Sequence, residues 1–245
     1  MTVPVPESTS RRAGARTNIT VPDTPRARGD QGDRAARTRE AILTAALSLY
    51  AAEGYGVVTM RGIANRLGFS APAIYNYFLS KEEIFSTLQD IGLDLMAAAV
   101  LTSETADPLA DFRAIFTNYY AFCKANPEYF SLLYVDPAAP HVMHDTPALQ
   151  RMGDETNRRF SRCLESGAFA DHAPVHVPGL FWALVHGIAV LRRVSAMPPE
   201  ADFDPQVAVG LDLLIAGLKA GLVPSHAYRP FDPTKPGLLN TSTPR

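Results

Sequence analysis

The sequence predicts an all-α protein in which a small three-helix domain near the N-terminus precedes a larger helical bundle. Apolar residues recur with helical spacing between about residues 34 and 221, and no strand-like alternation with turn dipeptides recurs. Residues that favour helix starts follow one another closely after residue 58. Hydrophobic residues make up 47% of the 245 residues, which is enough for a sizeable core.

Four parts are expected along the chain: residues 1–33, 34–81, 82–223 and 224–245. The two end segments are poor in large apolar residues and rich in proline and polar residues, which predicts disordered tails. The chain up to residue 81 holds eleven basic and six acidic residues and so carries +5, which leaves −7 for the rest. A basic N-terminal part favours a nucleic-acid contact at that end. A solvated arginine-rich tail without a target is the alternative.

Several classes of protein are disfavoured by the composition. Cys123 and Cys163 are far apart and form no CxxC motif, so neither a disulfide framework nor a zinc site is expected. The longest apolar run, Leu180 to Leu191, falls short of the roughly 20 residues of a membrane-spanning helix. Residues 1–33 contain no apolar signal-peptide core, and no common catalytic motif occurs. We therefore expect a cytoplasmic protein that is not an enzyme, with no cofactor, no metal and no membrane partner.

The first helix is expected from about Arg34 to Glu53. Three helix starts follow, each with a side chain suited to cap the first turn: Thr59, Ser70 and Ser80. The residues before these caps are apolar and are expected to pack against the helix that follows, as hydrophobic staples: Val58, Phe69 and Leu79. Because helices this short do not persist alone, they must pack against the first helix.

The segment 59–78 predicts a helix, a tight turn and a second helix. Gly68 lies where the turn needs a positive φ, and Pro72 falls in the first turn of the second helix, where a missing N–H is tolerated. Ile63 and Leu67 are expected to face inward from the first helix, and Ile74 and Phe78 from the second. This pattern is typical of a DNA-binding helix-turn-helix, in which the second helix enters the major groove.

Three short runs in this region resemble the TetR family of transcriptional regulators. They are Ile-Ala-Asn-Arg-Leu-Gly at 63–68, Ile-Tyr-Asn-Tyr-Phe at 74–78 and Ser-Lys-Glu-Glu at 80–83. The resemblance covers about residues 36–85 and implies a DNA-binding regulator. Further along, Trp182 and His186-Gly187 resemble the Trp…His-Gly motif of one C-terminal subgroup of that family.

The resemblance also implies a set of DNA contacts. Cationic and hydroxyl side chains near helix starts would bind phosphate, and Asn76 would pair with adenine in the major groove. Tyr77 lies three residues after Ile74, so partial burial is the alternative for it. The expected DNA-binding residues are Thr59, Arg61, Ser70, Ala71, Pro72, Ala73, Tyr75, Asn76, Tyr77 and Lys81.

The rest of the chain predicts helices near 81–103, 108–126, 146–168, 174–194 and 204–221, with a short turn at residues 128–134. Aromatic side chains gather in these helices, and we expect them to line a ligand cavity between the helices. Solid core is the alternative, and for the histidine a hydrogen-bonded core position. The candidates are Phe112, Phe116, Tyr119, Tyr120, Phe130, Tyr134, Trp182 and His186.

A stripe of period 3.5 on the last helix is expected to pair with a second copy of the chain in a four-helix bundle: Val207, Leu211, Leu214 and Leu218. Packing inside one chain is the alternative. The resemblance therefore implies a homodimeric repressor that a small apolar effector releases from operator DNA. Two other interpretations stay open: a DNA-binding regulator controlled by a protein partner or by no ligand, and a helical small-molecule enzyme or carrier with a vestigial DNA-binding part.

Overall fold

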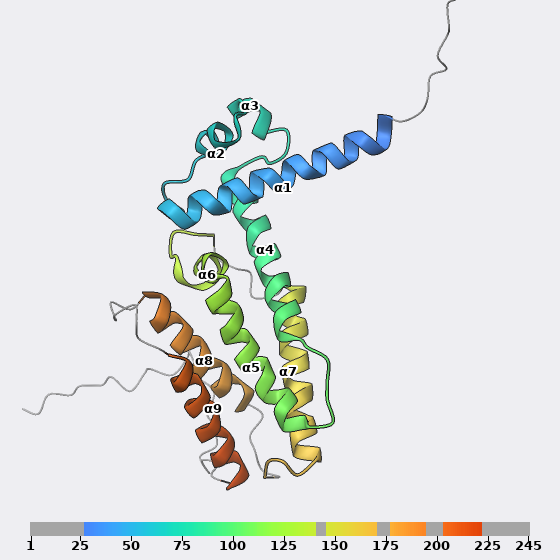
Figure 1. Cartoon of the computed structure of the whole chain (residues 1–245), viewed down its shortest axis with the longest axis vertical. Coiled ribbons are helices and arrows are strands. Elements are labelled where there is room, and N and C mark those ends of the chain that lie inside the picture. Colours follow the sequence, from blue (N-terminus) through green and yellow to red (C-terminus); the bar gives the residue numbers. More distant parts are fainter. Residues whose placement is uncertain (1–26, 141–145, 171–176, 195–202, 222–245) are drawn as a thin grey trace, which may run out of the picture. The chain divides into compact units, whose positions relative to one another are not determined.

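The computed structural model describes residues 27–140, 146–170, 177–194 and 203–221 (Figure 1). Over these ranges the chain consists of helices and loops without any strand, which confirms the all-α prediction. Most of the two expected tails, 1–33 and 224–245, lies outside the described residues. The chain divides into two compact units, Met1–Glu40 and Ala41–Arg245.

Helix α1 spans Ala27–Glu53 and begins within the segment 1–33 that we expected to be disordered, rather than near Arg34. The chain contains no proline between Pro25 and Pro72, so nothing in this stretch prevents the backbone from becoming helical. Residues 27–33 include two glycines and two aspartates, which are poor helix formers, so helix propensity does not explain this early start.

The second unit begins with a head, which we define as residues 41–88. Helices α2 (Met60–Leu67) and α3 (Ala71–Ile74) pack with the last turns of α1 and the first turns of α4 (Lys81–Val100) around one hydrophobic core. Of the side chains that we expected to face inward, Ile63, Ile74 and Phe78 are at most 1% exposed, whereas Leu67 is only partly buried. The principal members of this core are Ile42, Ala46, Ile63, Ile74, Phe78, Ile84, Phe85 and Leu88.

Only one of the three predicted staples packs as expected. Val58 is 3% exposed and belongs to the head core. Phe69 is 39% exposed and Leu79 81% exposed, so the prediction was wrong for both. The carboxylate of Glu83 accepts a hydrogen bond from the Leu79 backbone N–H at 2.6 Å. This bond satisfies the start of α4, and the apolar contact from Leu79 is not needed there.

Helix α4 belongs to both parts of this unit. Its first turns supply Phe85 and Leu88 to the head core, and its later turns supply Met96 and Val100 to a second core. The hydrophobic core of the head therefore continues past Lys81, where we expected a domain boundary.

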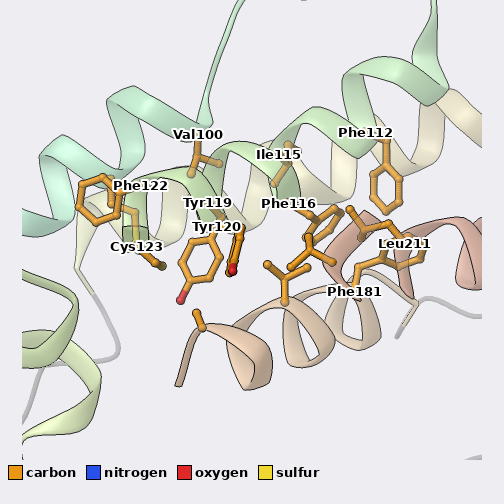
Figure 2. Packing of buried hydrophobic residues seen from close by; sticks show 14 of the residues in the cluster. Val100, Phe112, Ile115, Phe116, Tyr119, Tyr120, Phe122, Cys123, Phe181 and Leu211 are labelled. Atoms are coloured by element: carbon orange, nitrogen blue, oxygen red, sulfur yellow. The ribbon is translucent and has the colours of Figure 1, made fainter. Parts of the chain in front are cut away.

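The body, residues 89–221, is a bundle of helices around α5 (Pro108–Ala125). Helix α5 packs against α4, α7 and α8 (Figure 1). Buried side chains of α5 point toward α8 and α9, and Phe181 of α8 and Leu211 of α9 face them (Figure 2). The other elements are α6 (Pro127–Phe130), η1 (Ser131–Val135), α7 (Pro147–Glu165), α8 (Val177–Val194) and α9 (Asp204–Lys219).

Element η1 is a single turn of π-helix where we expected an ordinary turn. Its defining bond runs from the Asp136 N–H to the Ser131 carbonyl over 2.9 Å, five residues apart. Single π turns are rare and occur often at functional sites.

A fully buried arginine joins α7 to the loop before α5. The Arg159 side chain is 1% exposed; its Nε donates to the Glu155 carboxylate at 2.7 Å, and its guanidinium also donates to the carbonyls of Asp111 and Thr102.

Burial alone would raise the pKa of the Asp111 carboxyl. Hydrogen bonds from Thr105 and the charge of Arg162 outweigh that effect and lower the pKa.

Candidate DNA-binding surface and ligand cavity

The helix-turn-helix of the head has the Thr59 cap and the Gly68 turn that its sequence predicts, but its second helix is shorter than we expected. The Thr59 hydroxyl accepts a hydrogen bond from the Gly62 N–H at 3.0 Å and so caps α2. Gly68 ends α2 at φ 68°, a left-handed conformation that favours glycine. Helix α3 is one turn long, and the chain continues through a turn as far as Tyr77.

Ser70 precedes α3 but its side chain makes no capping hydrogen bond, contrary to our expectation. The reason lies in the next residues. Pro72 has no N–H to offer, and the Ala73 N–H already donates to the Ser70 carbonyl at 3.0 Å. The exposed Ser70 hydroxyl is therefore not used by the helix start that it precedes.

The ten expected DNA-binding residues lie between the start of α2 and the start of α4, and none of them is fully buried. Six are exposed: Thr59, Arg61, Ser70, Pro72, Tyr75 and Asn76. Four are partly buried: Ala71, Ala73, Tyr77 and Lys81. Tyr77 packs against the head core, as the alternative interpretation of this residue predicted.

Lys81 has a structural partner that sequence reasoning missed. Its Nζ donates to the Tyr55 carbonyl at 2.9 Å and lies 3.8 Å from the centre of the Tyr55 ring. The Tyr55 hydroxyl in turn donates to the Glu82 carboxylate at 3.3 Å. Lys81 thus holds the loop between α1 and α2 against the start of α4. An ammonium has three donors, so this contact leaves capacity for a phosphate.

A cavity of about 670 Å³ lies in the body between α4, α5, η1, α7 and α8. Four of the eight aromatic and histidine candidates line it: Phe116, Tyr119, Tyr134 and Trp182. The remaining lining residues carry no charge, and most are aliphatic: Met96, Val100, Ile115, Leu133, Leu149, Met152, Gly153, Thr156, Asn157, Pro178 and Gly179. Sequence reasoning missed these residues because an aliphatic side chain beside a cavity has the same helical spacing as one in solid core.

The other four candidates do not line this cavity, and our expectation for them is corrected. Phe112 is fully buried, and its ring packs against four other phenylalanine rings, so it is solid core. Phe130 packs against the rings of Tyr134 and His186. Tyr120 lines two smaller hollows, one between α5, α6 and α8, which Phe130 also lines, and one between α5 and α9. His186 is removed from the cavity by one layer of side chains, since it lies behind Tyr119, Tyr134 and Trp182.

His186 connects three walls of the cavity. Its Nδ1 is 2.7 Å from the Tyr119 hydroxyl, its ring stacks on Trp182 with centroids 4.4 Å apart, and the Tyr134 ring meets it edge-on at 5.0 Å. Burial lowers the pKa of the imidazole, because the charged form loses hydration. A neutral His186 therefore holds the hydroxyl of Tyr119, one of the residues that line the cavity.

The stripe that we expected to form a dimer interface packs inside its own chain. Val207, Leu211 and Leu218 are at most 7% exposed, and Leu214 packs against the same core. The stripe faces the body because α9 packs against α8 there: a Cβ at Gly210 would lie 2.8 Å from the Leu184 side chain. The expectation of an intermolecular role was therefore wrong for Val207, Leu211 and Leu218, while for the partly buried Leu214 it stays a proposal.

Other apolar residues of α8 and α9 are exposed. On α8, Leu180, Leu191 and Val194 are each more than half exposed and share one side with Gly187. On α9, Val209 is 56% and Leu213 68% exposed. Helix α8 is the one helix in the described part of the chain that is long and apolar enough to cross a membrane. Helix α8 is apolar on two sides. One side packs in the body core, and the other carries the exposed residues Leu180, Leu191 and Val194.

The head and the body together define a helix-turn-helix protein with a separate helical domain that encloses a cavity. Comparison with known families identifies both parts. Residues 42–88 match the family model described as bacterial regulatory proteins, tetR family, and residues 112–214 match that of the tetracyclin repressor-like C-terminal domain. The two models together cover more than half of the chain, which belongs to the TetR family of bacterial regulatory proteins.

Individual relatives are distant. An uncharacterized HTH-type transcriptional regulator from Bacillus subtilis, YfiR, is 38% identical over 53 residues, which span 22% of this chain and 26% of that protein. A protein of unknown function from Rhodococcus sp. RHA1 has the same fold with a TM-score of 0.62 at 24% identity, covering 74% of this chain and 95% of that one. The TetR family regulator PfmR from Thermus thermophilus matches with a TM-score of 0.55 at 21% identity, covering 72% of this chain and 98% of that one.

Proposed function

We propose that the protein is a homodimeric repressor of transcription that binds operator DNA through its two heads and leaves it when a small, uncharged, mainly apolar molecule enters the cavity of the body. The observation that carries this proposal is the combination of a helix-turn-helix, with its expected contact residues at least partly accessible, and an uncharged cavity on the same helix α4. A protein of this kind would act in the cytoplasm. The Trp…His-Gly subgroup stays a proposal, supported by the stack of Trp182 on His186.

Each part of the head would have a distinct role on DNA. The hydroxyl of Ser70, the guanidinium of Arg61 and the free donors of Lys81 would bind phosphates and fix the register on the duplex. Asn76, exposed just after α3, would read a base edge in the major groove. The small side chains of Ala71 and Ala73 would allow the short α3 to approach the bases closely.

The exposed apolar residues of α8 and α9 are the surface that we propose for dimerisation, in place of the buried stripe. A dimer is needed because two recognition elements must reach half-sites about 34–36 Å apart on DNA. A contiguous apolar surface on two adjacent helices favours a second copy of the same chain, which would pair the two helices of each protomer in a four-helix bundle.

The cavity indicates the chemistry of the effector. Its volume suits a molecule of drug-like size, and among the residues that the structure describes, none that lines the cavity carries a charge. Burying an unpaired charge there would be costly, so a carboxylate or an ammonium would be rejected. The Tyr119 hydroxyl, with Thr156 and Asn157, supplies the few polar contacts.

Selection of duplexes from a random-sequence pool by the purified full-length protein tests the DNA-binding part of the proposal. We expect one enriched motif with two-fold symmetry, bound more weakly at about 200 mM than at about 50 mM salt. Asn76→Ala should change the selected motif, while Lys81→Gln should weaken binding to all duplexes. Because Lys81 also holds Tyr55, its variant must first be shown by urea unfolding to be folded.

Binding of Nile red, an uncharged apolar dye, tests the cavity. We expect saturable fluorescence enhancement in the unmodified protein, and loss of it in Gly153→Trp, whose new side chain starts from a cavity-lining position with open space around it. Gly153→Ala is the matched control and should bind the dye normally. A protein that selects DNA but binds no apolar molecule would support control by a protein partner. A protein that selects no DNA would support a helical carrier or enzyme.

A further inference from the structure

The smaller hollow between α5, α6 and α8 has a volume of about 190 Å³ and a chemistry opposite to that of the large cavity. The two share no lining residue. Among the described residues that line the smaller hollow, three are cationic and none is acidic, so we call it the basic hollow. These lining residues are Tyr120, Cys123, Lys124, Pro127, Phe130, Ala189, Arg192 and Arg193.

Helical spacing brings the three cations to this place. On α8, Arg192 and Arg193 follow the buried Ala189 by three and four residues. On α5, Lys124 follows Tyr120 by four residues. Because residues three or four apart share one side of a helix, the two arginines lie on the side of α8 that packs in the body. They are therefore separate from the exposed apolar side of α8 that we propose for dimerisation.

The positive charge of the basic hollow is only partly neutralised. Lys124 forms an ion pair with Asp204 at the start of α9. The Nε of Arg193 donates to the Ser131 hydroxyl at 2.6 Å, and that partner carries no charge. Neither Arg192 nor Arg193 forms an ion pair with a described residue. An anion in the hollow would thus meet two guanidinium groups that have no counterion in contact.

The two arginines differ in their surroundings. Arg193 also lines an adjacent hollow together with Glu128 and Asp136, whose negative charges act on it from that side. Arg192 lines the basic hollow and not the adjacent one, and it is exposed. Arg192 is therefore the cation whose charge is most available to an anion in the basic hollow.

A buried hydroxyl beside the basic hollow provides a second, independent observation. Tyr120 is 5% exposed, and its hydroxyl has no hydrogen-bond partner. Burial raises the pKa of this hydroxyl, and the nearby charges of Arg192 and Asp204 act in opposite directions, but neither residue is placed to form a hydrogen bond with it. Buried polar groups are normally paired, so the fold leaves one donor unused at this position.

We propose that the basic hollow binds a small oxyanion, a phosphate or a carboxylate group, between Arg192, Arg193 and the Tyr120 hydroxyl. A guanidinium offers a planar set of donors that suits such groups, and the hydroxyl supplies one more. The volume is below the roughly 300–1,000 Å³ of sites for drug-sized ligands, which favours a compact ligand. The exposed Arg192 side chain can turn to admit an oxygen atom beside the hydroxyl. This site is additional to the proposed effector cavity, whose uncharged walls would reject such a ligand.

Isothermal titration calorimetry of the full-length protein with sodium phosphate, and separately with sodium acetate, tests the proposal. Sodium chloride keeps the ionic strength at about 150 mM, so that general screening is the same throughout. We expect saturable binding of at least one of the two anions, and the stronger one identifies the site as a phosphate or a carboxylate site. Tyr120→Phe and Arg192→Gln should each weaken that binding roughly threefold or more.

Arg151→Gln is the matched control for charge. It also removes one exposed arginine, on α7, which does not line the basic hollow, and it should bind the anion as the unmodified protein does. Tyr120→Phe is expected to have an unchanged or higher Tm in buffer without phosphate or acetate, because the hydroxyl that it removes has no partner. Arg192→Gln changes an exposed side chain and provides an independent variant that should fold.

Four results would overturn the proposal. The first is that neither anion binds saturably. The second is that Tyr120→Phe and Arg192→Gln bind as the unmodified protein does, which would place the anion elsewhere, for example at the DNA-contact residues of the head. The third is that Arg151→Gln weakens binding as much as Arg192→Gln, which would show a general effect of net charge. The fourth is a lower Tm of Tyr120→Phe without anion, which would show that the hydroxyl already has a partner in the protein.

Discussion

Arginines 158 and 159 are neighbours on α7 that should differ sharply in their effect on stability. The Arg159 side chain is 1% exposed and donates to Glu155 and to two backbone carbonyls, those of Asp111 and Thr102. The Arg158 side chain is 52% exposed, and its ion pairs with Glu104 and Glu155 lie at the surface. Substitution of each by methionine keeps a long apolar stem and removes the charge and the donors.

We expect Arg159→Met to lower the free energy of unfolding by about 3–5 kcal/mol, because it leaves two carbonyls without their donor and removes one of the two arginine partners of Glu155. For a chain of this size that corresponds to a Tm lower by roughly 6–20 °C. Arg158→Met should cost less than about 1 kcal/mol, since exposed ion pairs contribute little. Urea unfolding followed by far-UV circular dichroism measures both values.

Two results would refute this reasoning. Equal losses in the two variants would show that burial of the Arg159 guanidinium does not decide its contribution. A loss below about 1 kcal/mol for Arg159→Met would show that the carbonyls of Asp111 and Thr102 find other donors. Arg159→Lys separates charge from geometry: a lysine cannot reproduce the planar set of donors, so we expect it to recover only part of the loss.

Three further predictions concern the head, the cavity and the proposed dimer surface. Thr59→Ala should destabilise the protein by about 1 kcal/mol, while Ser70→Ala should change stability by less than about 0.5 kcal/mol in the same urea titration, because only the threonine caps its helix. His186 should quench the stacked Trp182, the only tryptophan, when it becomes protonated, with a fluorescence midpoint below pH 6.5, and His186→Gln should abolish the transition. Because the folded pKa of His186 is lowered, the unfolded chain takes up the proton first, and stability should fall as the pH drops below about 6.5; stability that is constant across this range would contradict the lowered pKa. Leu213→Glu should convert a dimer to a monomer in analytical ultracentrifugation, and Ser161→Glu, exposed on α7, should not; a dimer that survives Leu213→Glu would exclude this surface.

The head was predictable because its signals are local. The Thr59 cap and Gly68 turn each depend on neighbours within four residues, and Ile63 and Ile74 follow helical spacing toward one core. Where local rules failed, a competing local bond was the reason. The Ser70 hydroxyl caps no N–H, because Pro72 has none and the Ala73 N–H donates to the Ser70 carbonyl. The Leu79 side chain is exposed, and its backbone N–H already donates to the Glu83 carboxylate.

The body was predictable as helices but not as a site. The eight candidates were chosen for their aromatic character, yet whether a ring lines the cavity or fills the core depends on residues brought from other helices. Phe112 and Phe116 are one turn apart on α5; the first is enclosed by four phenylalanine rings, and the second lines the cavity. The same limit explains the error on α9, where the stripe at 207–218 is periodic whether it faces a partner or its own chain.

The sequence by itself determined the all-helical class, the helix-turn-helix and the resemblance to the TetR family, because caps, turns and helical periodicity are properties of neighbouring residues. Only the tertiary structure decided which aromatic residues line the cavity, that Lys81 also holds Tyr55, and that α9 presents Val209 and Leu213 rather than its periodic stripe. It alone showed that η1 lies between the cavity and the head core. These features depend on contacts between segments far apart in the chain, and no spacing within one helix encodes them.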